Sequence, residues 1–146
     1  MKERDRVQSP AASLAQRRVY WSTVGGLKVL CIDFSAASTG EKLAMLADGR
    51  AILEKAAPDS VLILSDLTQM DFDAATANKW KALGVEFYPR IRGMAFYGST
   101  GVLNTAVGSY VALTHWFALP GADRKIRVFK AREQAVEWLL KRKSAA

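Results

Sequence analysis

The sequence predicts a single α/β domain with a mostly parallel sheet of four to five strands, an N-terminal β-hairpin and about four helices. Short apolar runs alternate with longer segments of helical periodicity, which is the order of a sheet joined by crossover helices. The chain has 146 residues, half of them hydrophobic, and can form one core without disulfide bonds. We expect residues 1–16 to be a flexible polar segment and residues 17–146 to form the domain.

The predicted hairpin consists of two β-prone runs, residues 17–23 and 27–34, around Gly25-Gly26. Two adjacent glycines supply the positive φ angles of a tight turn. The second run is almost continuously apolar, which is typical of a strand covered on both faces. It contains the only cysteine, Cys31, which we interpret as a small buried hydrophobe. A single free cysteine, with no N-terminal secretory signal, favours the cytoplasm.

A helix is predicted next, because Ser38 and Glu41 have the spacing of a capping box. It should extend to about Ala56. Four of its residues are expected on or near the face that contacts the sheet: Leu43, Leu46, Ala47 and Leu53.

The central predicted unit is a buried strand, 61–66, followed by an acidic turn and a helix over about 72–83. Gly84 is expected to end this helix. Its inward stripe has spacings of four, four and three residues and consists of Phe72, Thr76, Trp80 and Leu83.

The remaining predicted elements are a strand over 92–97, a turn over 98–101, a long helix over 102–119, a strand over 125–129 and a helix over 131–142. Pro120-Gly121 ends the long helix. Four residues of the last helix are expected to face inward: Ala131, Ala135, Trp138 and Leu139.

The net charge of +7 is concentrated at the two ends of the chain, with +3 in residues 1–18 and +6 in residues 124–146. Residues 1–18 contain no aromatic residue or glycine, and residues 124–146 contain only Phe129 and Trp138, which is not the regular interleaving that single-strand nucleic-acid binders require. We interpret them as solvated charge and expect no nucleic-acid partner. No apolar run approaches the roughly 20 residues of a membrane span, so at most peripheral membrane contact is expected.

An ordered set of local motifs covers about residues 19–140. The set comprises Ile32-Asp33-Phe34-Ser35, Asp66-Leu67-Thr68, Met70-Asp71-Phe72-Asp73, Ala95-x-x-Gly98-x-x-Gly101 before Ala106-Val107, and Arg132-Glu133-x-Ala135-x-x-Trp138-Leu139. With this order of elements, the chain resembles the STAS superfamily, the fold of bacterial anti-sigma-factor antagonists. It is most similar to the SpoIIAA-like branch, which is related in fold to lipid-carrying CRAL-TRIO domains. The resemblance implies a bacterial signalling domain that acts through protein–protein contacts.

Classical members of this superfamily carry a phosphorylatable serine at the start of the helix after the central strand. The equivalent switch region here comprises Asp66, Thr68, Asp71, Asp73 and Thr76, and the stretch 71–76 contains no serine. The predicted helical stripe turns Thr76 towards the core, and a phosphate beside two carboxylates would be repelled. This departure puts the family's phosphorylation switch in doubt for this chain.

The aspartates of the acidic turn are also candidates for a metal or acid–base site. Together with Asp33 and Asp66, they could meet at the carboxyl ends of neighbouring strands, where a hard cation such as Mg²⁺ would accept them. Helix capping and turn chemistry explain Asp71 and Asp73 without a metal. Because neither a histidine nor a nucleophile lies near them in sequence, we predict no catalytic residue, no metal and no cofactor.

The helix predicted over 102–119 is apolar around most of its circumference. Such a helix is either deeply buried or faces a partner. The candidate contact residues are Val102, Tyr110, Val111, Leu113, Trp116 and Phe117. We expect a non-catalytic regulatory module that binds a protein partner or a second copy of itself as a homodimer. The alternatives are a carrier or sensor of a small apolar ligand, such as a fatty acid, bound under this helix, or simple packing of the helix on the N-terminal segment.

Overall fold

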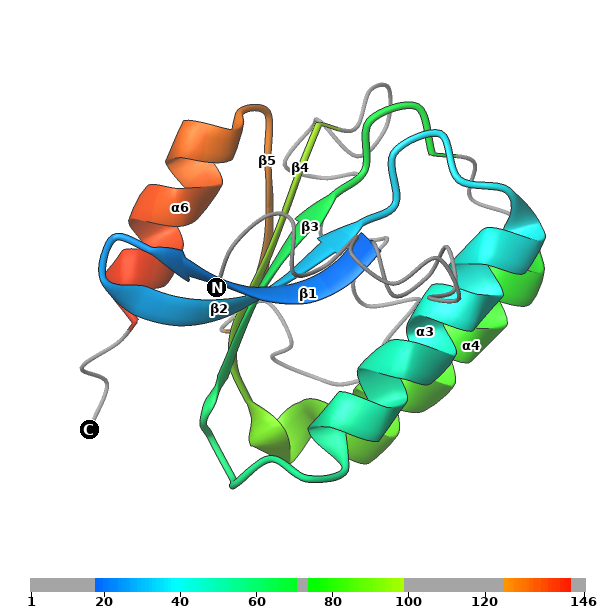
Figure 1. Cartoon of the computed structure of the whole chain (residues 1–146), viewed down its shortest axis with the longest axis horizontal. Helices are drawn as coiled ribbons and strands as arrows, with labels where there is room; N and C mark the ends of the chain where they lie inside the picture. The colour runs from blue at the N-terminus through cyan, green and yellow to red at the C-terminus, as the bar shows by residue number, and fades with distance from the viewer. Residues whose placement is uncertain (1–17, 71–73, 99–124, 143–146) are drawn as a thin grey trace, which may run out of the picture.

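A computed structural model describes residues 18–70, 74–98 and 125–142, and its elements follow the predicted order (Figure 1). The elements are β1 (Val19–Val24), β2 (Leu27–Asp33), α3 (Thr39–Leu53), β3 (Val61–Asp66), α4 (Ala74–Phe87), the 3₁₀ helix η1 (Tyr88–Arg90), β4 (Ile91–Tyr97), β5 (Ile126–Phe129) and α6 (Arg132–Leu140). The predicted helix over 102–119 and the predicted flexible segment over 1–16 lie outside the described residues.

The five strands form one mixed sheet in the order β1-β2-β3-β4-β5. β1 pairs with β2 in the antiparallel sense, and each of the other three pairings is parallel. Gly25 and Gly26 connect the hairpin with φ angles of 56° and 84°, which confirms the predicted glycine turn. An α/β domain with an N-terminal hairpin is therefore present in the described residues.

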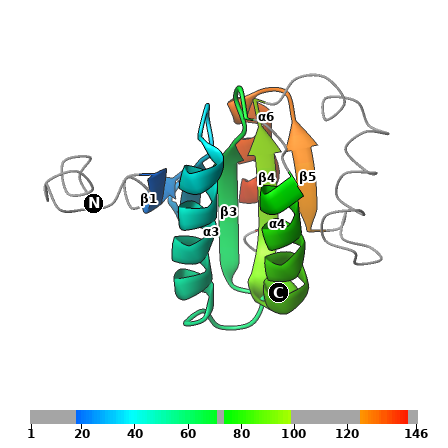
Figure 2. The same cartoon turned by 90° about the vertical axis from the view of Figure 1, so that its right-hand side faces the viewer.

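The helices are divided between the two faces of the sheet, as Figures 1 and 2 show. α3 joins β2 to β3, and α4 joins β3 to β4, with each connection advancing by one strand in the same direction. Crossovers of one hand that advance in one direction place their helices on the same face. α6 follows the last strand and packs against the opposite face, on β3, β4 and β5.

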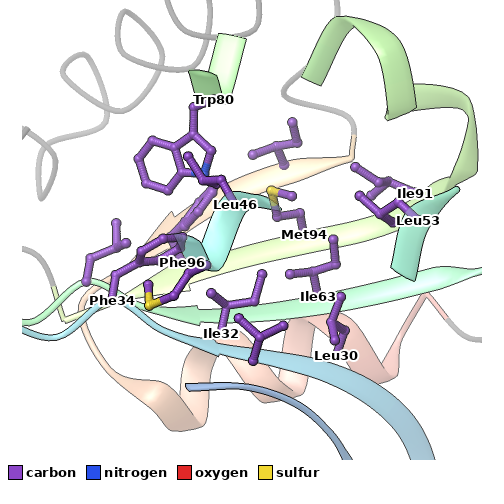
Figure 3. Close-up of a cluster of buried hydrophobic side chains, with 14 of the residues drawn as sticks. Leu30, Ile32, Phe34, Leu46, Leu53, Ile63, Trp80, Ile91, Met94 and Phe96 are labelled. Carbon is purple, nitrogen blue, oxygen red and sulfur yellow. The ribbon is translucent and has the colours of Figure 1, made fainter. Parts of the chain in front are cut away.

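The core on the α3/α4 face is large and contains a cluster of aromatic rings among its aliphatic side chains (Figure 3). The Trp80 ring lies edge-on to Phe34 and Phe96, with ring centroids 5.1 and 5.5 Å apart. Edge-to-face geometry is a favoured arrangement of aromatic rings and adds to the free energy gained from burial. Trp80 is 4% exposed, which confirms its predicted inward position.

The core on the α6 face is smaller and includes Cys31, Ala135 and Leu139. Cys31 is buried, as predicted, whereas Trp138 is only half-buried and packs beside Phe129 with ring centroids 5.9 Å apart. The end of α6 is tied to β4 by a reciprocal pair of arginines. Arg92 Nη1 donates to the Arg142 carbonyl oxygen at 3.0 Å, and Arg142 Nε donates to the Arg92 carbonyl oxygen at 2.9 Å.

Helix α3 begins as predicted but ends earlier. Ser38 Oγ accepts from the Glu41 N–H, and Glu41 Oε1 accepts from the Ser38 N–H, which confirms the capping box. The helix ends at Leu53, where the Arg90 guanidinium donates to the carbonyl oxygens of Leu53 and Glu54 at 2.8 and 2.6 Å. A cation that binds the last carbonyls stabilises a helix end.

The buried face of α3 is rotated from the predicted one. Leu46 and Leu53 are buried as expected, but Leu43 is half-buried and Ala47 is exposed. The buried residues of the helix are Lys42, Met45, Leu46, Gly49 and Leu53. The prediction is wrong here because it assumes that every apolar residue near the stripe faces the sheet.

Helix α4 continues past Gly84 to Phe87, so the prediction that Gly84 ends it is wrong. Gly84 is buried within the helix, between Trp80 and Phe87, which are 4% and 3% exposed. Three buried residues at spacings of four and three form one helical stripe. Burial of Phe87 therefore holds the last turn in place, and this outweighs the cost of about 1 kcal/mol for glycine in a helix.

Candidate functional site

The carboxyl ends of β2 and β3 carry the same short motif, an aspartate followed two residues later by a hydroxyl residue. Asp33 Oδ1 accepts from the backbone N–H and the hydroxyl of Ser35, and Asp66 Oδ1 accepts from the same two groups of Thr68. These are local aspartate turns. Asp33 and Asp66 are register partners on neighbouring strands, so the two turns lie side by side.

Main-chain hydrogen bonds join the loops that follow β2, β3 and β4. The Ala36 N–H donates to the Thr68 carbonyl oxygen at 2.9 Å, and the Leu67 N–H donates to the Tyr97 carbonyl oxygen at 2.8 Å. Ala36 and Gln69 have φ angles of 50° and 56° in these loops. Non-glycine residues with such angles persist only where the surroundings hold them. In the described residues, main-chain hydrogen bonds therefore hold the loops after β2 and β3 in a defined conformation at the carboxyl edge of the sheet.

Gly98, directly after β4, packs closely onto the Asp66–Thr68 turn. Its φ angle is 86°, and a Cβ atom there would lie 3.0 Å from Asp66 Oδ1 and 3.2 Å from the Thr68 nitrogen, and closer still to Thr68 Oγ1. Only glycine fits this backbone conformation and this approach without strain. The predicted Ala95-x-x-Gly98 spacing thus has a physical reason at this edge.

A polar pocket of about 120 Å³ lies beside these turns, on the α6 face. Asp33, Asp66 and Tyr97 are register partners across β2, β3 and β4, so their side chains form a row on one face. Arg132 reaches the pocket from the first turn of α6. The pocket is lined by Tyr20, Cys31, Ile32, Asp33, Leu64, Asp66, Tyr97 and Arg132.

The pocket raises the pKa of Tyr97. Burial, together with the negative charges of Asp66 and Asp33, raises the pKa of the Tyr97 phenol to about 12, while the positive charge of Arg132 opposes this shift. Loss of the proton would place a third negative charge beside two carboxylates. The shift therefore favours the neutral phenol further, and a neutral phenol can both donate and accept a hydrogen bond.

The predicted switch region is only partly described. Asp66 and Thr68 form the turn above, and Thr76 is 1% exposed, which confirms that it faces the core. Asp71 and Asp73 lie outside the described residues. So do the predicted contact residues of the long helix, which are Val102, Tyr110, Val111, Leu113, Trp116 and Phe117.

An apolar cavity of about 40 Å³ lies between α3, α4 and the sheet, in the core shown in Figure 3. Gly49 and Gly84 line it from the two helices, and a Cβ atom at Gly49 would meet nothing within 4 Å. A single water needs roughly 10–15 Å³, so this cavity is far too small for a fatty acid. The predicted apolar-ligand site beneath residues 102–119 lies outside the described residues and stays a prediction.

Sequence reasoning did not single out Tyr20, Tyr97 or Arg132 as site residues. Strand alternation could have placed Tyr97 beside Asp66, because both end strands of one parallel pair and share a face. Arg132 could not have been found in this way. Its position depends on how α6 docks on the sheet, which local sequence does not encode.

Metal-binding clusters and membrane-spanning helices are both absent from residues 18–70, 74–98 and 125–142. Within these ranges, no three histidine, cysteine, aspartate or glutamate side chains gather closely enough to hold a metal ion. No helix in the same ranges is long and apolar enough to cross a membrane.

Comparisons of the chain with models of protein families, with curated proteins and with solved structures found no match.

Proposed function

We propose that this chain is a STAS-like, non-catalytic regulatory module that acts through contact with a protein partner or with a second copy of itself. The arrangement of the described elements supports this proposal. An antiparallel hairpin at one edge leads into parallel strands, and both crossover helices lie on one face. In the described residues, the sequence motifs that resemble the STAS superfamily fall on β2, β3 and β4, in the loops that follow these strands, and on α6.

The hydrogen-bonded turns at the described part of the carboxyl edge carry the proposal. They contain Asp66 and Thr68 of the switch region, fixed by hydrogen bonds to their own turn and to neighbouring loops. A surface that is already ordered loses little conformational entropy when a partner binds. Gln69 lies exposed at the tip of this edge.

The module is proposed to work without a phosphate on Thr76. Thr76 lies on the buried face of α4 and is 1% exposed, so a kinase would reach its hydroxyl only after local unfolding. Asp33 and Asp66 are each held in position by a local turn through Oδ1. Regulation would then depend on the abundance of the partner or on a ligand of the module itself.

The test compares two single substitutions that add the same charge at opposite edges of the sheet. Gln69→Lys changes an exposed side chain at the carboxyl edge, and Ala57→Lys changes an exposed residue before β3. Light scattering and chemical cross-linking with mass spectrometry would report self-association and partner binding. We expect the unsubstituted chain and Ala57→Lys to form the same complex, and Gln69→Lys to weaken it.

Two results would contradict the proposal. One is a strict monomer that captures no partner. The other is a complex that both substitutions leave unchanged, because the contact would then lie away from the carboxyl edge.

A further inference from the structure

The polar pocket on the α6 face has walls of opposite charge. Asp33 and Asp66 carry the negative charge from adjacent strands, and Arg132 carries the positive charge from α6. Arg18 also lies near Asp33, but its Nη1 donates to the carbonyl oxygens of Asp33 and Ser35 at 3.0 and 2.9 Å. Among the described residues that line this pocket, the Arg132 guanidinium is therefore the cationic group available to a ligand.

Hydrogen-bonding capacity is left over on both walls. Each aspartate uses Oδ1 for its own turn, and within the described residues neither Oδ2 atom accepts a hydrogen bond. The Tyr97 hydroxyl and the Arg132 guanidinium likewise have no hydrogen-bond partner in the described part of the chain. Polar atoms in a recess that form no hydrogen bond of their own, here the two Oδ2 atoms, the phenol and the guanidinium, are available to water or to a ligand.

The size of the pocket limits what can enter. Its volume of about 120 Å³ is well below the roughly 300–1,000 Å³ of sites for drug-sized molecules. The occupant must be small, and it must offer a cationic donor to the carboxylates and an anion to the guanidinium. Both charges must lie on one short molecule.

We propose that this pocket binds a small zwitterion of the α-amino-acid class, with its ammonium group between Asp33 and Asp66 and its carboxylate on Arg132. Tyr97 lies beside Asp66 in the row and supplies a neutral hydroxyl between the two charged ends. The first turn of α6 adds a favourable field for the ligand's carboxylate, because its N-cap residue, Ala131, has no side-chain acceptor to occupy the free N–H groups.

Other small ligands fit these walls less well. A divalent cation prefers six or more oxygen ligands and would be repelled by Arg132. A simple anion such as phosphate would meet two carboxylates. A zwitterion pairs its ammonium group with the two carboxylates and its carboxylate with Arg132, and each pairing forms a charge-assisted hydrogen bond.

The experiment uses the full chain and the twenty proteinogenic α-amino acids, each added separately in a thermal-unfolding assay. A ligand that binds only the folded state raises Tm in a concentration-dependent way. We expect at least one amino acid to raise Tm by several degrees, and isothermal titration calorimetry would then give its Kd. Arg132→Gln and Asp66→Asn should each weaken binding roughly tenfold or more. The amide introduced by Asp66→Asn retains an Oδ1 acceptor for the turn with Thr68, so this variant should still fold.

The matched control is Arg127→Gln, which changes an exposed arginine on β5 that does not line the pocket. It removes the same charge and should leave Kd unchanged. Derivatives of the amino acid that binds test the two ends of the ligand separately. Affinity for its amide should not depend on Arg132, and affinity for its N-acetyl form should not depend on Asp66.

Three outcomes would overturn the proposal. The first is that no amino acid shifts Tm. The second is that an amino acid binds Arg132→Gln as tightly as the unsubstituted chain. The third is that Mg²⁺ or inorganic phosphate alone raises Tm and that Asp66→Asn or Arg132→Gln, respectively, abolishes the effect.

Discussion

The two faces of the sheet are stabilised by different means. On the α3/α4 face, large apolar side chains such as Phe34, Trp80 and Phe96 fill the space between the sheet and two long helices. On the α6 face, one short helix packs its own Ala135 against small side chains of the sheet such as Cys31 and Ala95, and a polar pocket opens beyond it at the carboxyl edge.

This difference shows how one sheet can combine stability with a polar recess. Burial of apolar area is the main favourable term in folding, and the α3/α4 face supplies most of it. The α6 face then tolerates charged groups that are only partly buried. We expect substitutions on the first face to change stability most, and those on the second face to change binding most.

The largest expected effect comes from replacing one tryptophan on each face. Trp80→Ala should lower the free energy of unfolding by about 3–5 kcal/mol, because it removes a buried ring between Phe34 and Phe96. Trp138→Ala should cost only about 1–2 kcal/mol, because that ring is half-buried. Urea denaturation of both variants tests the comparison, and equal losses would show that the two faces contribute alike.

An intermediate effect is expected at the carboxyl edge. Gly98→Ala places a methyl group against the Asp66–Thr68 turn at a φ angle of 86°, and should cost about 2–4 kcal/mol. Gly26→Ala is the matched control, because its φ angle is 84° and a Cβ atom there meets nothing within 4 Å. Gly26→Ala should lower the free energy of unfolding by only about 1–2 kcal/mol, which is the cost of the positive φ angle for alanine. If thermal unfolding shows equal losses, Gly98 does not owe its role to contact with the turn.

The smallest expected effect is a pH dependence within α3. Asp48 has a buried Oδ2 atom without a hydrogen-bond partner among the described residues, and burial raises its pKa above 3.8. The folded chain then holds this proton more tightly than the unfolded chain. The stabilising contribution is complete below pH 3.8 and is lost as pH rises through the higher pKa of the folded state. Asp48→Asn should therefore be more stable than the unsubstituted chain at pH 7, and this advantage should disappear below pH 3.8.

Glu41 on the same helix should give a pH dependence of stability with the opposite sign. The hydrogen bond from the Ser38 N–H lowers the pKa of this exposed carboxyl group, so its contribution is present at neutral pH and is lost as pH falls through the lowered value. Glu41→Gln should be slightly less stable than the unsubstituted chain at pH 7. Chemical denaturation of Asp48→Asn and Glu41→Gln at pH 7 and below pH 3.8 would measure both changes in the free energy of unfolding. Greater stability of Glu41→Gln at pH 7 would contradict the sign assigned to Glu41.

Much of the fold could be predicted because its signals are local. The Gly25-Gly26 turn and the Ser38–Glu41 capping box depend on residues within one turn of each other, and both are present. The strand over 61–66 has the predicted bounds because an apolar run ends at an aspartate. Gly84 misled the prediction because its own propensity is outweighed by burial of Phe87, a tertiary effect.

The candidate site was harder to predict from the same information. Asp33 and Asp66 stand out in the sequence as strand-end carboxylates. The turn chemistry that the sequence predicts concerns Asp71 and Asp73, which lie outside the described residues. In the structure, Asp33 and Asp66 each form a local turn. Their pocket could not be recognised, because it requires the register of β2, β3 and β4 and the docking of α6.

The sequence by itself determined the order of the described strands and helices, the hairpin turn and the start of α3, since each follows from backbone preferences and apolar spacing over a few residues. Only the tertiary structure decided which side chains meet across the sheet. It placed Tyr97 next to Asp66 and brought Arg132 to the same recess. Packing of whole elements fixes these distances, and it depends on the summed burial of many residues far apart in the chain.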